Sequence, residues 1–109
     1  MAERHEVLVS VYRARLIRKG FGIKRDPFYD YKPDIYAVRG RSELIIEIEI
    51  CSTFDSEHTI NQLSHMHDYA MSRPRSAGVL VVPRSCQHYA EFMLFAMYGG
   101  SRKMTVVGI

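Results

Sequence analysis

The stretch LIIEIEIC, from Leu44 to Cys51, is the clearest β-strand signal in the chain and decides the fold class around it. Every second residue from Leu44 to Ile50 is apolar, and a strand directs alternate side chains to opposite faces. Glu47 and Glu49 therefore share the other face. A solvated face of an antiparallel sheet explains this alternation, but two carboxylates in an isoleucine-rich strand also suit a bound cation, which offsets the cost of burying them.

The segments on either side of this strand predict helices and further strands. Helices are expected over residues 3–19, 56–72 and 86–98, and strands over residues 21–25, 34–38, 78–83 and 104–109. In the order αβββαβαβ, the first three strands can form an antiparallel meander, and the last two arrive through helical crossovers as parallel strands. We therefore expect residues 1–109 to form one domain, a three-layer α/β/α sandwich with a central mixed sheet.

Helical spacing assigns two stripes to the second of these helices, which Asp55 or Ser56 is expected to cap. The apolar stripe follows a helical repeat and holds Ile60, Leu63, His67 and Ala70, and the neighbouring stripe holds Gln62, His65 and Tyr69. We expect His67 to be packed and hydrogen-bonded.

The composition excludes several classes of protein. The 109 residues are 47% hydrophobic and 25% charged, unlike a disordered tail or a disulfide-dense miniprotein. No apolar run approaches the roughly 18 residues of a membrane span, and the first residues lack the layout of a signal peptide. Cys51 and Cys86 lack metal-type spacing and are expected to be reduced core residues. We expect a cytoplasmic protein of a prokaryote or of the host cell of a virus.

Basic residues gather in one part of the chain, although 15 basic and 12 acidic residues give a net charge of only +3. Residues 13–25 contain no acid and six cations: Arg13, Arg15, Arg18, Lys19, Lys24 and Arg25. This run fits either a solvated helix face or a surface that binds phosphates.

The segment Lys32-Pro33-Asp34-Ile35, followed by the Leu44–Glu49 stretch, resembles the motif of the PD-(D/E)xK nuclease superfamily. The resemblance extends from the first helix to the strand near Val79, although the motif letters are few. Members share a restriction-endonuclease-like core and include archaeal Holliday junction resolvases and small viral nucleases. The resemblance implies that Asp34 and Glu47 bind Mg²⁺ or Mn²⁺, and we expect the Ile48 backbone carbonyl to add an oxygen ligand.

Two other positions follow from the resemblance. The third motif residue, normally a lysine, is Glu49 here, as in some members of the superfamily. It can orient water or bind a second ion, but it supplies no positive charge. A first-helix glutamate often contacts the metal, and Glu6, with Glu3 as second choice, fits that position.

Further residues are candidates for catalysis or for nucleic-acid contacts. Gln62 matches a glutamine that often lies near the active site of the superfamily. The candidate nucleic-acid-binding residues are Arg13, Arg15, Lys24, Arg25, Lys32, Thr53 and His65. Four aromatic residues near Asp34 could stack on unpaired bases or anchor their own loop: Phe28, Tyr29, Tyr31 and Tyr36.

The helix expected over residues 86–98 is apolar on nearly every side. Such a helix is buried on more than one side, which predicts a homodimer through Phe92, Phe95 and Met97. Packing between the sheet and the chain ends is the alternative.

These patterns favour a metal-dependent endonuclease that hydrolyses DNA phosphodiester bonds, with branched or structured DNA of recombination or repair as its substrate. The alternative is a DNA-binding module that keeps the fold without the chemistry, because the motif lysine is missing. A protein-interaction subunit and RNA cleavage also stay open.

Overall fold

The computed structural model describes the backbone of residues 3–54 and 56–109 and the side chains from His5 onward, except that of residue 55. Its elements, in chain order, are α1 (Glu3–Arg18), β1 (Gly22–Ile23), β2 (Ile35–Arg39), β3 (Ser42–Ile48), the 3₁₀ turn η1 (Cys51–Thr53), α2 (Glu57–Ser72), β4 (Ser76–Val82), the 3₁₀ turn η2 (Arg84–Cys86), α3 (Gln87–Tyr98) and β5 (Met104–Gly108). The five-stranded mixed sheet and three helices confirm the α/β class and the expected order of elements.

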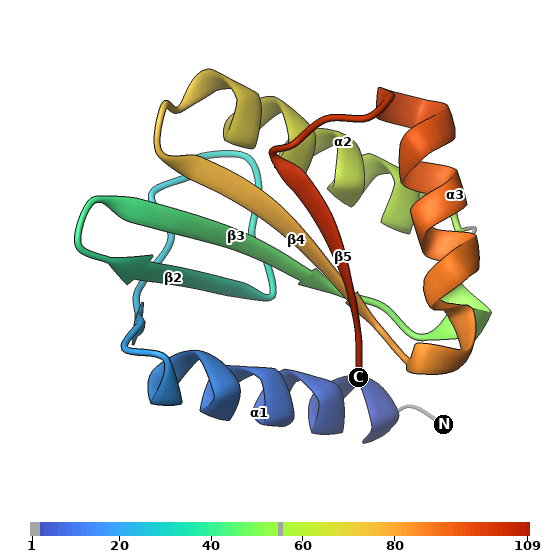
Figure 1. Cartoon of the computed structure of the whole chain (residues 1–109), viewed down its shortest axis with the longest axis horizontal. Coiled ribbons are helices and arrows are strands. Elements are labelled where there is room, and N and C mark those ends of the chain that lie inside the picture. The colour runs from blue at the N-terminus through green and yellow to red at the C-terminus, as the bar shows by residue number, and fades with distance from the viewer. Residues whose placement is uncertain (1–2, 55) are drawn as a thin grey trace.

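The sheet has the spatial order β1-β2-β3-β4-β5 (Figure 1). β1, β2 and β3 form the expected antiparallel meander, in which Ile35 of β2 pairs with Ile46 of β3. β4 and β5 are added in parallel, and Ile46 pairs with Val79 of β4. The tight β2–β3 turn contains Gly40, whose φ of 60° a side chain would disfavour. The crossovers through α2 and α3 bring the ends of β3 and β4 to the same edge.

Helices lie on both faces of the sheet (Figure 1). Ile46 and Ile48 belong to one core cluster with Tyr12 and Leu16 of α1. Residues of the opposite parity, such as Ile45, join a second cluster that includes residues of α2 and α3. The alternation of the Leu44–Cys51 stretch thus supplies both cores, and each buried isoleucine contributes about 1.5–3 kcal/mol.

The predicted 44–51 strand is too long, because β3 ends at Ile48. The Glu49 N–H still donates to the Val81 carbonyl at 3.0 Å, after which the chain turns into η1. This turn brings the Thr53 hydroxyl back to the Glu49 carboxylate, 3.0 Å away. The polar contact replaces further strand pairing.

The buried stripe of α2 differs from the expected one at two of its four positions. Ser56 caps the helix, accepting a hydrogen bond from the Thr59 N–H at 3.1 Å, whereas residue 55 lies outside the described residues. The buried positions are Thr59, Leu63, Met66 and Ala70, and Ile60 is 36% exposed. Thr59 takes the inward position in place of Ile60, because its hydroxyl donates a hydrogen bond to Glu49. His67 is packed and hydrogen-bonded as expected: it stacks on Tyr98 with ring centroids 4.2 Å apart, and its Nδ1 lies 3.4 Å from Asp68 Oδ1.

Cys51 and Cys86 form a disulfide, so the expectation of reduced core cysteines was wrong. They are 35 residues apart in sequence, but they follow the adjacent parallel strands β3 and β4, and their Cα atoms lie 6.0 Å apart. A disulfide is more typical of an oxidising compartment than of the expected cytoplasm. No helix of the described part of the chain is long and apolar enough to cross a membrane.

α3 is covered on one side only. Ala90 and Leu94 are buried, but Phe92 is 67% and Phe95 66% exposed, and Gly99 ends the helix with a φ of 72°. The alternative of a central helix packed on several sides is therefore wrong. The apolar outer face of α3 is exposed, and no other described part of the chain covers it.

Candidate functional site

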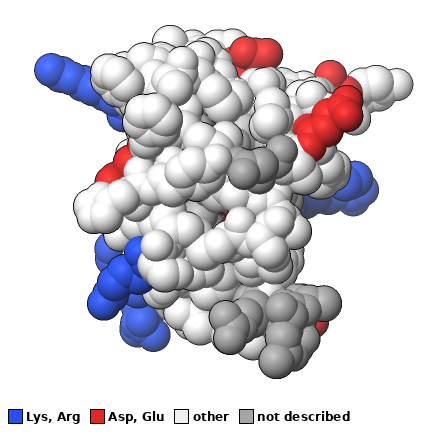
Figure 2. Space-filling view, turned by 90° about the vertical axis from the view of Figure 1, so that its right-hand side faces the viewer, with Lys and Arg blue, Asp and Glu red and all other residues white. Residues whose placement is uncertain are grey.

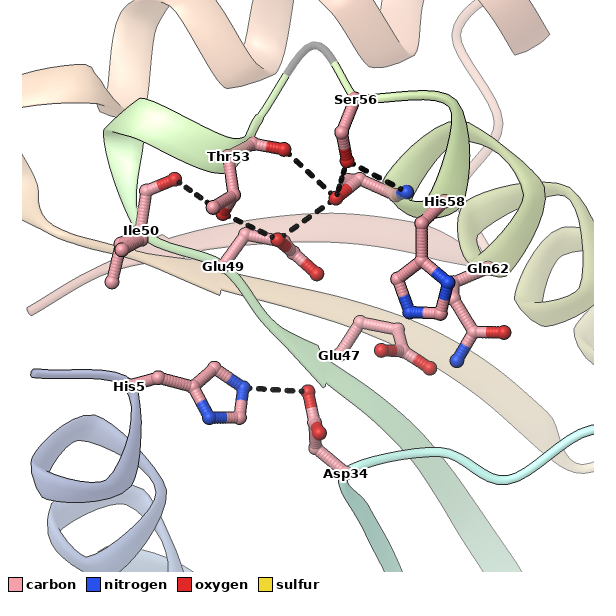
Figure 3. Close-up of a pocket in the computed structure, with 10 residues that line it drawn as sticks. His5, Asp34, Glu47, Glu49, Ile50, Thr53, Ser56, His58 and Gln62 are labelled. Atoms are coloured by element: carbon pink, nitrogen blue, oxygen red, sulfur yellow. Dashed lines mark hydrogen bonds and ion pairs between the residues drawn. The ribbon is translucent and has the colours of Figure 1, made fainter. Parts of the chain in front are cut away.

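A cavity of about 400 Å³ lies between the first turns of α1 and α2, beside the end of β3 (Figure 3). Its lining residues are His5, Asp34, Glu47, Glu49, Ile50, Thr53, Ser56, His58, Thr59 and Gln62. The cavity thus joins all three motif carboxylates with residues from four segments of the chain.

Asp34 is held at the start of β2 by the neighbouring strand. Its Oδ2 accepts a hydrogen bond from the Ile48 N–H at 2.8 Å. The pairing of Ile35 with Ile46 places Asp34 opposite Glu47 in the hairpin register. The short β2–β3 connection therefore brings the two expected metal-binding carboxylates together, as the sequence predicts. The Ile48 carbonyl remains a predicted ligand.

Glu47 is 2% exposed, which excludes the solvated-face interpretation for this residue. Burial raises the pKa of Glu47 to about 9, and the charges of Asp34 and Glu49 act in the same direction. The Tyr31 hydroxyl donates a hydrogen bond to Glu47 Oε2, which opposes the rise. Burial and the Glu47 carboxylate in turn raise the pKa of Tyr31. A cation in the cavity would favour the ionised form of Glu47.

Glu49 is fixed by two hydroxyl groups. Thr59 Oγ1 and Thr53 Oγ1 donate to the same oxygen, Oε1, at 2.9 and 3.0 Å. Burial raises the pKa of Glu49, whereas these two hydrogen bonds lower it. The other carboxylate oxygen points toward the middle of the cavity (Figure 3). This oxygen is placed to bind a water molecule or an ion.

The first helix contributes His5 rather than Glu6. His5 Nε2 lies 3.3 Å from Asp34 Oδ2, whereas Glu6 is exposed and does not line the cavity. The side chain of Glu3 lies outside the described part of the chain. One residue turns a helix by about 100°, so neighbouring positions point in different directions. The family resemblance predicts a carboxylate at this position and therefore does not indicate the His5 imidazole.

The start of α2 supplies the rim of the cavity. Gln62 lines the cavity as expected, and its Nε2 donates to the Lys32 carbonyl at 3.4 Å. His58 was not selected from the sequence, but it points toward the same space (Figure 3). The signal that could have identified it is its position one helical turn before Gln62.

Most predicted nucleic-acid-binding residues lie away from the cavity. Thr53 is part of the lining, but His65 packs against the Tyr31 ring, with centroids 5.6 Å apart. Arg15 lies over the Tyr12 ring on α1. The described lining includes no Lys or Arg. It therefore lacks all five basic residues that were predicted to bind nucleic acid: Arg13, Arg15, Lys24, Arg25 and Lys32.

The loop before β2 is anchored by its aromatic side chains. Phe28 lies 4.3 Å from the Tyr69 ring and 5.7 Å from the Tyr36 ring, measured between centroids. Tyr31 is buried in the same cluster, and only Tyr29 of the four candidates is fully exposed. The anchoring interpretation holds for Phe28, Tyr31 and Tyr36, and Tyr29 alone is open for stacking.

Oxygen and nitrogen donors converge in the cavity, but among the described residues no three His, Cys, Asp or Glu side chains form a ready metal-binding group. Glu47 Oε2 is engaged by Tyr31 and Glu49 Oε1 by the two threonines. The donor set is nevertheless of the type that hard divalent cations use. Comparison of the chain with protein-family models, curated proteins and solved structures finds no match.

Proposed function

We propose that the protein is a metal-dependent nuclease with the three-layer, restriction-endonuclease-like core of the PD-(D/E)xK superfamily. One observation carries the proposal: Asp34 and Glu47 meet across the β2–β3 hairpin in a cavity that also contains Glu49. A buried carboxylate with a strongly raised pKa, in a cavity beside two further carboxylates, is typical of a functional site.

Asp34 and Glu47 would hold the ion, with the Ile48 carbonyl and His5 as additional donors. When bound, Mg²⁺ or Mn²⁺ lowers the pKa of a water molecule and polarises a phosphodiester. The His5 nitrogen, 3.3 Å from Asp34 Oδ2, takes the place expected for Glu6. Because imidazole suits transition ions better than Mg²⁺, we expect higher activity with Mn²⁺.

Glu49 and α2 would position the attacking water and the phosphate. Thr53 and Thr59 hold Glu49 Oε1, so the other oxygen can accept a hydrogen bond from water. His58 and Gln62 line the opposite side, where their N–H groups can donate to a phosphate oxygen. These donors partly compensate for the missing motif lysine.

Branched or structured DNA is the proposed substrate, in recombination or repair. It suits a homodimer, because two copies present two cavities to two strands. The exposed side chains of Phe92, Phe95 and Met97 support a dimer through α3. The substrate itself rests on the resemblance to resolvases.

A cleavage assay tests this function. Labelled single-stranded, duplex, flapped and four-way-junction DNA, with matched RNA, are incubated with Mg²⁺, Mn²⁺ or EDTA. Glu47→Ala should abolish metal-dependent cleavage, whereas Glu6→Gln, which removes an exposed carboxylate from α1, should retain it. No cleavage by the wild-type protein, or cleavage that survives Glu47→Ala, would contradict the proposal.

The second candidate is a DNA-binding module without catalysis. Glu49 in place of the motif lysine favours it, as does a described cavity lining without Lys or Arg. Salt-sensitive DNA binding without metal-dependent cleavage would support this function.

A further inference from the structure

Arginine and lysine residues gather at the end of the sheet opposite the cavity. Arg39 closes the β2–β3 turn by pairing with Ser42, and its Nη1 donates to the Lys19 carbonyl at 2.8 Å. The Glu43 N–H donates to the Arg75 carbonyl at 2.8 Å, which joins the start of β4 to this turn. We call this surface the basic end, and it comprises Arg18, Lys19, Arg39, Arg41 and Arg75.

The charge of the basic end is not neutralised within the described part of the chain. Glu43 is the nearby acid, and its carboxylate is occupied by Arg73, at 2.8 and 2.7 Å. Arg41 and Arg75 are exposed, and neither guanidinium has a hydrogen-bond or ion-pair partner among the described residues. A helix C-terminus accounts for a cation at Arg18, but not for these two arginines.

Exposed cations also lie on the segment of chain that leads from the basic end to the cavity. Lys24 follows the edge strand β1, and its N–H donates to the Tyr36 carbonyl. Arg25 comes next, and Lys32 lies two residues before Asp34 at the cavity. All three lysine and arginine side chains are exposed. The face at the cavity end, in contrast, has its visible Lys and Arg side chains at its margins (Figure 2).

The length of α1 gives the length of a path from the cavity to the basic end, because the helix runs from His5 to Arg18. Thirteen residues at 1.5 Å each span about 20 Å. Phosphates of one DNA strand are spaced by about 3.4 Å along the axis, so the path corresponds to about six nucleotides.

We propose that the basic end binds the nucleic-acid backbone about six nucleotides from the bond in the cavity, and that Arg41 and Arg75 supply a metal-independent share of the affinity. This inference rests on the proposed function. Guanidinium groups suit phosphates because they donate in a planar fork. The consequence is a length requirement: substrates too short to reach the basic end should have a raised KM and an unchanged kcat.

Fluorescence anisotropy in EDTA tests the binding. A labelled duplex of about 20 base pairs is titrated at several salt concentrations with wild-type protein and with the Arg41→Gln/Arg75→Gln variant. We expect about tenfold weaker binding and a log–log salt slope smaller by about 1.8, or 0.9 for each lost contact. The control, Arg84→Gln, removes one exposed charge beyond the opposite end of β4 and should bind as the wild type does.

The outcomes separate this inference from the proposed function. An equal loss per removed charge in both variants, or no loss in Arg41→Gln/Arg75→Gln, overturns it. Binding of anionic vesicles rather than DNA through these arginines also overturns it. If the wild-type protein cleaves nothing but the DNA-affinity difference appears in EDTA, the basic end stands and the nuclease function fails. If cleavage occurs, a raised KM at unchanged kcat in the variant supports it.

Discussion

Replacing Glu47 with Gln should stabilise the metal-free protein at neutral pH. The Glu47 pKa is raised from 4.5 to about 9 in the folded chain, because the carboxyl is buried. Below pH 4.5 the carboxyl is protonated in both states. As the pH rises from 4.5 to 9, the unfolded chain loses this proton first, so the free energy of unfolding falls by about 1.4 kcal/mol per pH unit.

This relation gives the size of the effect. At pH 7, about 2.5 units above the unfolded pKa, the carboxyl should cost roughly 3 kcal/mol, and Gln avoids that cost. Gln also keeps the volume of the side chain and an oxygen that can accept a hydrogen bond from Tyr31. Function thus opposes stability at this residue, as is common for active-site groups.

Urea unfolding in EDTA between pH 5 and pH 8 measures the difference. Glu47→Gln should exceed the wild type by under 1 kcal/mol at pH 5 and by about 3 kcal/mol at pH 7. Glu6→Gln, at an exposed position, should show no such divergence. A gap between Glu47→Gln and wild type that is the same at both pH values would refute the reasoning. Added Mn²⁺ should stabilise the wild type with release of protons, and should affect Glu47→Gln less.

Three further predictions concern stability. Reducing the Cys51–Cys86 disulfide opens a 35-residue loop and should cost about 4 kcal/mol, so an unchanged urea midpoint with dithiothreitol would contradict it. Hydrogen bonds from Arg73 lower the pKa of Glu43 to about 2. This stabilisation, about 2 kcal/mol after solvent screening, is present above pH 4.5 and is lost as the pH falls toward 2; acid titration of Glu43→Gln should lack this loss. Phe54→Ala, at a 1% exposed position, should cost about 3–5 kcal/mol in urea unfolding, and a loss below 1 kcal/mol would exclude a core role.

The sequence alone predicts the strands, their order and the pair of carboxylates at the centre of the candidate site. Alternate side chains of a strand point to opposite faces, so the sequence from Leu44 onward predicts which residues lie on each face of β3. The β2–β3 connection is short, and therefore Asp34 and Glu47 have to be neighbours. These features depend on contacts between residues that are close in sequence or lie on two strands joined by one short turn.

Tertiary packing decides what local periodicity leaves open. α1 is rotated so that His5, and not Glu6, lines the cavity. The sequence does not predict this rotation, because the apolar residues of α1 spread around the helix and do not define its inner face. The buried position of Thr59 depends on Glu49, which is ten residues away in sequence. The disulfide and the basic end arise where separate segments meet at the two edges of the sheet. The sequence predicts parallel strands after the meander, but it does not predict that the residues beyond β3 and β4 come close enough for a disulfide, and only the folded chain determines that.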